Sequence, residues 1–150
     1  MARGVTRLCV GAILRRDGHI LLGKRTDTRP FYPGVWDLPG GHCEPEEIVE
    51  HALARELQEE IGVTPTAWRP LSVLQQPDAT RDAYVLHVYL ITSWQGTPHN
   101  RAPEEHSELA WIALAAAGHL ALAHPDYPTL FQQVAAVGKA GESGARHADD

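Results

Sequence analysis

The chain has 150 residues, of which 43% are hydrophobic and 21% are charged, and its net charge at pH 7 is −6. This length and composition are typical of one globular domain and argue against a multidomain, collagenous or wholly disordered protein. The acidic balance also disfavours binding to a nucleic acid polymer, because such binding depends on neutralising many phosphates.

Cys9 and Cys43 are the only cysteines. They do not form a spacing typical of a disulfide framework or a zinc site. The apolar runs are shorter than the ~20 residues that span a bilayer, and the N-terminus lacks the pattern of a secretory signal. We therefore expect a cytoplasmic protein without a membrane partner.

The N-terminal region predicts an antiparallel hairpin. Residues 5–14 and 19–23 are apolar, and Asp17-Gly18 between them is a strong signal for a two-residue turn. Residues 26–35 contain two prolines and a glycine, so we expect a loop there.

A helix is predicted from Pro45 to about Ile61. Proline suits a first helical position, and the neighbouring glutamates favour the positive end of the helix dipole. Gly62 is suited to ending the helix.

The second half of the chain predicts two long strands and a closing helix. Residues 67–76 and 83–94 are rich in β-branched and aromatic side chains. Residues 101–108 are polar and are expected to form a loop. The next segment, residues 109–114, is short and apolar. A helix is expected over residues 128–137.

This order of elements predicts an α/β fold with a mixed β-sheet covered by helices. The domain is expected to span residues 1–137. Residues 138–150 contain three glycines and no apolar periodicity, which predicts a disordered tail.

Three glutamates of the predicted helix share one arc. With 100° per residue, Glu56, Glu59 and Glu60 lie within about 100° of one another, at the edge of an apolar stripe. Clustered carboxylates are the ligands that hard cations such as Mg²⁺ or Mn²⁺ prefer. A solvated acidic helix face is the alternative for these three residues taken alone. The stripe consists of Val49, Leu53, Leu57 and Ile61.

Residues 41–63 read GHCEPEEIVEHALARELQEEIGV, which resembles the Nudix box. The box consists of a Gly, five residues, a Glu, seven residues and then Arg-Glu-apolar-x-Glu-Glu-x-Gly-apolar. A chance match to every defined position is on the order of 10⁻⁷ for a chain of this length. The resemblance extends over roughly residues 5–137. The defined positions are Gly41, Glu47, Arg55, Glu56, Leu57, Glu59, Glu60, Gly62 and Val63.

The resemblance to the Nudix hydrolase family, and to its MutT-like members, implies an α/β/α sandwich and a pyrophosphohydrolase that uses Mg²⁺ or Mn²⁺. By the matching of motif positions, Glu56, Glu59 and Glu60 are expected to bind the metal, together with a backbone carbonyl near Gly41. The resemblance also implies that Arg55, with Glu47, orients these carboxylates.

The implied reaction is attack by water on a phosphorus atom of a pyrophosphate. Glu59 or Glu60 is a candidate for the base that accepts the water's proton. Some family members use a further Glu before a Trp. Glu105, which precedes Trp111 by six residues, ranks ahead of Glu104 for this role, and a solvated loop charge is the alternative.

Four residues are candidates for substrate binding by the same resemblance. Arg25 matches an arginine that meets phosphate, although a solvated cation at a strand end is equally expected. Phe31 or Tyr32 is a candidate for stacking on a base. Asp126 is a candidate for reading a purine edge, and a helix N-cap is its alternative.

The expected substrate is a small-molecule nucleotide. A nucleoside triphosphate, with an oxidised purine such as 8-oxo-dGTP as one candidate, would be cut to the monophosphate and pyrophosphate. A nucleoside diphosphate sugar or ADP-ribose is the alternative within the same enzyme class, and a non-catalytic nucleotide-binding module is the alternative outside it. The sequence leaves open whether the protein is a monomer or a homodimer.

Overall fold

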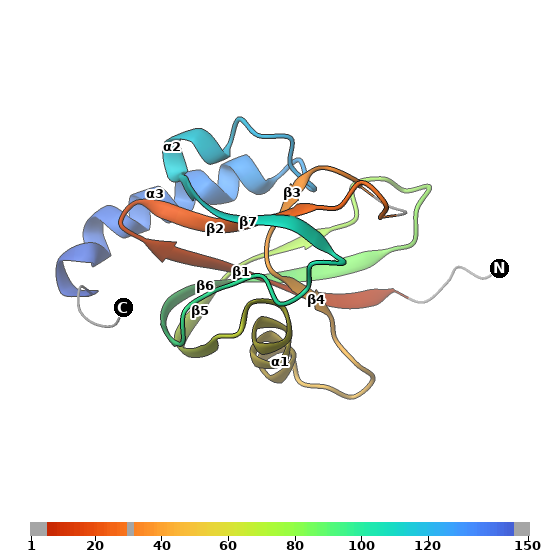
Figure 1. Ribbon diagram of the computed structural model, residues 1–150, viewed down its shortest axis with the longest axis horizontal. Helices are drawn as coiled ribbons and strands as arrows, with labels where there is room; N and C mark the ends of the chain where they lie inside the picture. Colours follow the sequence, from red (N-terminus) through yellow and green to blue (C-terminus); the bar gives the residue numbers. More distant parts are fainter. Residues whose placement is uncertain (1–5, 30–31, 146–150) are drawn as a thin grey trace.

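The computed structural model describes residues 6–29 and 32–145. Its strands and helices form three layers, with the sheet between α1 on one face and α2 with α3 on the other (Figure 1). The strands are β1 (Arg7–Arg16), β2 (His19–Arg25), β3 (Trp36–Asp37), β4 (Gly40–His42), β5 (Thr64–Gln75), β6 (Tyr84–Gln95) and β7 (His106–Ala113). The helices are α1 (Val49–Ile61), α2 (Leu114–Ala117) and α3 (Tyr127–Ala145).

The sheet is mixed, as the sequence predicts. Its order is β3-β2-β1-β6-β5, with β4 also paired to β1 and β7 also paired to β2. The β1–β6 pair is parallel, and the other strand pairs are antiparallel. The α/β/α sandwich on a mixed sheet is therefore confirmed.

The predicted N-terminal hairpin forms with the expected turn. Arg16 pairs with His19, and Asp17 and Gly18 between them have φ values of 53° and 75°. Positive φ at both central residues is the geometry of a type I′ turn, whose twist matches that of the flanking strands.

Strand β1 is buried on both faces, which explains its continuous apolar sequence. Val10, Ala12 and Leu14 belong to the core cluster shared with α1, whereas Ile13 belongs to the cluster shared with α3. The sheet thus separates two hydrophobic cores.

Helix α1 begins at Val49, so the predicted start at Pro45 is wrong. Glu46 has a φ of 67°, a left-handed conformation that does not continue a right-handed helix. The preceding residues instead form a turn, in which the backbone N–H of Glu47 donates to the carbonyl of Glu44 at 2.9 Å. The predicted end is confirmed, because Gly62 has a φ of 74° and caps the helix.

Two later segments also differ from the expectation. The polar residues 106–108, expected in a loop, begin β7 because they pair with the end of β2, Arg25 opposite His106. Helix α3 continues to Ala145, past the predicted end at Val137. Extending an existing helix costs less than nucleating one, so a docked helix can continue through weak helix formers.

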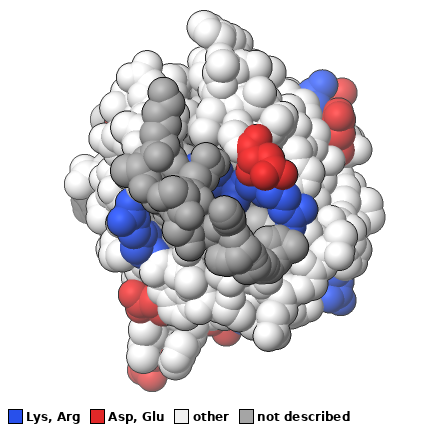
Figure 2. Space-filling model, turned by 90° about the vertical axis from the view of Figure 1, so that its left-hand side faces the viewer, with Lys and Arg blue, Asp and Glu red and all other residues white. Residues whose placement is uncertain are grey.

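Figure 2 shows the face at the left-hand end of Figure 1, where the described charged side chains form small, separate groups of both signs. Among the residues that the structure describes, no helix combines the length and the apolar character needed to cross a membrane.

Candidate functional site

A cavity of about 550 Å³ lies against the sheet, and two chemically different sets of side chains line it. The first set, the acidic wall, contains Glu56, Glu60 and Glu105, with His106 beside them. The second set, here termed the opposite wall, consists of Arg25, Tyr32, Asp37, Arg81, Tyr84 and Tyr127, and Arg29 lies at the junction of the two sets, in contact with Glu105.

Helix α1 supplies two buried carboxylates to the acidic wall. Glu56 and Glu60 are one helical turn apart and are only 9% and 6% exposed. Gly41 on β4 lies directly against Glu56, because a Cβ at this position would come within 2.5 Å of the Glu56 carboxylate. A residue with a side chain would therefore push this carboxylate away.

Burial and, to a smaller extent, the charge of the nearby Glu60 together raise the pKa of Glu56 from its ordinary value of 4.5 to about 7. Burial also raises the pKa of Glu60, although donors from His106 and Gly40 oppose this shift. Two buried carboxylates that repel each other are stabilised by a cation, and oxygen donors suit Mg²⁺ or Mn²⁺. The described residues therefore fit a divalent metal ion.

Arg55 forms hydrogen bonds with three glutamates of this region. Its guanidinium donates to both oxygens of Glu47, at 2.8 and 2.9 Å, and also to Glu56 at 3.1 Å and Glu59 at 3.3 Å. The hydrogen bonds from Arg55 lower the pKa of Glu47 to about 2. Arg55 thus holds the Glu56 carboxylate in one orientation without lining the cavity itself.

Glu59 differs from the two buried carboxylates in its exposure, although it shares the Arg55 guanidinium with Glu56. Its side chain is 58% exposed and does not line the cavity. The structure thus brings Glu56 and Glu60 together and leaves Glu59 at the rim.

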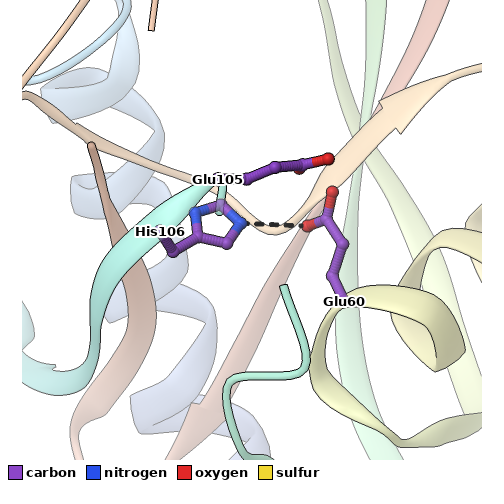
Figure 3. Close-up of side chains that lie close together, drawn as sticks. All are labelled: Glu60, Glu105 and His106. Carbon is purple, nitrogen blue, oxygen red and sulfur yellow. Dashed lines mark hydrogen bonds and ion pairs between the residues drawn. The ribbon is translucent and has the colours of Figure 1, made fainter. Parts of the chain in front are cut away.

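Strand β7 and the loop before it complete the acidic wall. Glu60, Glu105 and His106 each offer a ligand atom within 4.8 Å of the others, and their side chains converge (Figure 3). Glu105 remains 42% exposed, and Arg29 lies 4.0 Å from its carboxylate. The structure therefore places Glu105, the glutamate ranked first from the sequence, beside Glu60.

Asp37 is the centre of the opposite wall. Its Oδ1 accepts hydrogen bonds from the Tyr127 hydroxyl at 2.7 Å and the Leu38 backbone N–H at 2.8 Å. Its Oδ2 lies 3.4 Å from the Arg25 guanidinium, which also donates to the Tyr32 carbonyl at 3.0 Å. Arg25 thus lines the cavity while holding the loop that carries Tyr32.

Tyr32 is the aromatic candidate that the structure describes. Tyr32 lines the cavity, donates from its hydroxyl to Gln76 at 3.2 Å, and packs its ring 5.1 Å from the Arg81 guanidinium. Phe31 lies outside the described residues.

Asp126 does not line the cavity and is exposed. Its backbone carbonyl accepts the N–H of Leu130 at 3.3 Å, at the start of α3. This is the position of a helix N-cap, the alternative that the sequence leaves open.

Sequence reasoning missed Asp37, His106 and Tyr127. Asp37 stands three residues before the glycine pair that opens the box, and this closeness was a usable signal. His106 and Tyr127 gave no such signal, because their burial depends on contacts with distant strands.

Comparison with known proteins identifies the family. The NUDIX domain model matches residues 5–134. CTP pyrophosphohydrolase of Escherichia coli (strain K12) is 35% identical over 121 residues, which cover 81% of this chain and 86% of that protein. Nucleoside triphosphatase NudI of Salmonella agona (strain SL483) is 32% identical over 114 residues, covering 71% of this chain and 81% of the relative.

A solved structure gives the same result. The MutT NUDIX hydrolase from Burkholderia pseudomallei is 35% identical, has a TM-score of 0.75, and matches 87% of this chain and 99% of its own. The family match spans most of the chain, and the box glutamates lie in or beside the cavity. The chain therefore belongs to the Nudix family and is a MutT-like Nudix hydrolase.

Proposed function

We propose that the protein is a divalent-metal-dependent pyrophosphohydrolase that converts a nucleoside triphosphate and water into the nucleoside monophosphate and pyrophosphate. The observation that carries the proposal is that two buried carboxylates, Glu56 and Glu60, line the same cavity as arginine and tyrosine side chains. Its volume is within the range of small-molecule sites. Two relatives named for activity on nucleoside triphosphates support the same substrate class.

Glu56, Glu59 and Glu60, with a backbone carbonyl near Gly41, are the proposed ligands of Mg²⁺ or Mn²⁺. When bound, the cation neutralises phosphate oxygens and acidifies a water molecule. Glu59, at the rim, reaches this position by rotation of its exposed side chain. Arg55 keeps Glu56 oriented through the pair of hydrogen bonds that it forms with Glu47.

Three groups act on the substrate itself in this proposal. Glu105 accepts the proton of the attacking water, because it is open to solvent and adjacent to Glu60; Glu59 and Glu60 are the other candidates for the base. Arg25 and Arg29 line the cavity with positive charge that favours a phosphate chain. Tyr32, or Phe31, which precedes it in the sequence, stacks on the base.

The base is proposed to be one that presents N–H donors. Asp37 is a carboxylate inside the cavity, whereas Asp126 is outside its lining, so a donor edge would meet Asp37 first. Guanine, 8-oxoguanine and cytosine all carry such donors. An oxidised purine, as in 8-oxo-dGTP, and CTP are therefore the two substrates to compare first.

A panel of nucleotides tests this function. We would compare kcat/KM for CTP, dGTP, 8-oxo-dGTP, the other triphosphates, ADP-ribose and ADP-glucose, with Mg²⁺ or Mn²⁺ and with EDTA, and identify the products. We expect a monophosphate and pyrophosphate from a triphosphate, only with metal. A preference of more than 10-fold for either sugar conjugate would contradict the triphosphate assignment. Tight binding without turnover would indicate a binding module.

A further inference from the structure

His106 is buried deeply without a role in the chemistry described above. It is only 5% exposed, and its Nδ1 has no hydrogen-bond partner among the residues that the structure describes. An unpaired buried nitrogen is costly and rare, so the position of the ring calls for an explanation. The other ring nitrogen, Nε2, supplies one, because it lies 3.4 Å from Oε1 of Glu60.

Glu60 is held at one oxygen only. Its Oε1 accepts the backbone N–H of Gly40 at 3.1 Å as well as the contact from His106. Its Oε2 accepts no hydrogen bond from the described residues, and Figure 3 shows this second oxygen turned toward Glu105. One oxygen is thus fixed by β4 and β7, and the other is left for a ligand in the cavity.

We propose that His106 is a positioning residue, whose Nε2–H fixes Glu60 so that Oε2 is presented to the cation. The inference rests on the proposed metal site, in which Glu60 is a ligand. Partners of this kind orient metal ligands and reduce the freedom that the ligand would otherwise lose on binding.

Gly23 on β2 forms the back of the pocket that holds the ring. A Cβ at Gly23 would lie 2.9 Å from Nδ1 of His106 and 3.2 Å from its Cγ. The ring therefore packs against bare backbone, which keeps Nε2 directed at Glu60. A side chain at position 23 would displace the ring without touching the acidic wall.

Direct binding of Mn²⁺, followed by electron paramagnetic resonance of the free ion, tests the inference without any substrate. We expect His106→Leu to weaken Mn²⁺ binding by about 10-fold or more. His106→Gln should bind nearly as tightly as the wild type, because its side-chain amide can place an N–H near the position of Nε2. A merely structural role would not give this rescue.

A second variant keeps the test valid if His106→Leu folds poorly. Gly23→Ala should weaken Mn²⁺ binding through the displaced ring, and the double variant should bind no more weakly than His106→Leu alone, because both changes act on one contact. Val134→Ala is the matched control: this residue of α3 is fully buried in the core and does not line the cavity. It should lower Tm without changing Mn²⁺ affinity.

Wild-type Mn²⁺ affinity in His106→Leu would overturn the inference, as would an equal loss in Val134→Ala. Absence of Mn²⁺ binding by the wild type would overturn it too. The proposed function is judged separately by nucleotide turnover. Mn²⁺ binding that depends on His106, in a protein that hydrolyses no triphosphate, would support the inference and reject the function.

Discussion

The two walls of the cavity are built in different ways. Glu56 and Glu60 of the acidic wall come from one helix within a continuous motif, and Gly41 of the same motif packs against Glu56. The opposite wall joins Asp37 to Tyr127, residues 90 positions apart, through a hydrogen bond of 2.7 Å. In the proposed function, the first wall carries the chemistry common to the family, and the second carries the contacts that distinguish one nucleotide from another.

The largest effect is expected on the acidic wall. Glu60→Gln and Glu56→Gln should each lower kcat by about 10²-fold or more, because each removes a charge proposed to hold the cation. Steady-state rates at saturating Mg²⁺ would measure this loss. Glu50→Gln is the control, since Glu50 lies on the same helix but accepts its hydrogen bond from Tyr89, outside the cavity. Near-normal rates in both variants would refute the carboxylate assignment.

A change on the opposite wall should affect binding rather than turnover. Asp37→Asn keeps the size of the side chain but removes its charge, so KM for a triphosphate with a donor-bearing base should rise roughly 10-fold while kcat changes little. The split between KM and kcat would be measured on the preferred nucleotide. A fall in kcat as large as that of Glu60→Gln would show that binding and turnover are not assigned to separate walls.

Thermal unfolding should show how much the buried Glu56 carboxylate of the acidic wall destabilises the folded protein. Since the pKa of Glu56 is about 7 in the folded protein, against its ordinary 4.5, the folded state binds the proton more tightly than the unfolded state. The stability that this group contributes is therefore fully present below pH 4.5 and is lost as pH rises through 7. In EDTA, Glu56→Gln should unfold at a Tm roughly 3 °C or more above the wild type at pH 8, but not at pH 4.5.

The effect of Mg²⁺ on Tm provides a control for this prediction. Adding Mg²⁺ at pH 8 should raise Tm of the wild type more than that of Glu56→Gln, because the cation binds only the folded protein. An identical pH dependence of Tm in both proteins would argue against a strained Glu56 carboxylate.

The smallest effect is expected at Asp126. Asp126→Ala removes a negative charge from the N-terminus of α3, so Tm should fall by roughly 1–3 °C. KM should stay unchanged, because the side chain is exposed outside the cavity. A selective rise in KM for guanine nucleotides would instead give Asp126 the role of reading the purine edge.

Local features of the fold could be predicted from the sequence. The turn at Asp17-Gly18, the end of α1 at Gly62 and the shared face of Glu56 and Glu60 all depend on residues within a few positions of one another. Backbone preferences and helical periodicity act over this short range, so the local sequence is sufficient. The Nudix box at residues 41–63 also predicted the family and its class of reaction.

The start of α1 required more than local preference. Pro45 and the glutamates after it favour an early helix start, but Glu47 is instead bound by Arg55, eight residues further along the chain. This ion pair holds the turn in which Glu46 adopts a left-handed conformation.

The amino-acid sequence by itself determined the family, the order of the long strands and of helices α1 and α3, and the three box carboxylates. Only the tertiary structure decided that Glu59 lies at the rim, that Glu105 and His106 converge on Glu60, and that Asp37 meets Tyr127. The physical reason is the register of the sheet: β2 pairs with β7, and this pairing carries His106 from a polar stretch of the sequence into the interior. Pairings between distant strands depend on the packing of the whole core, which no short segment of the sequence encodes.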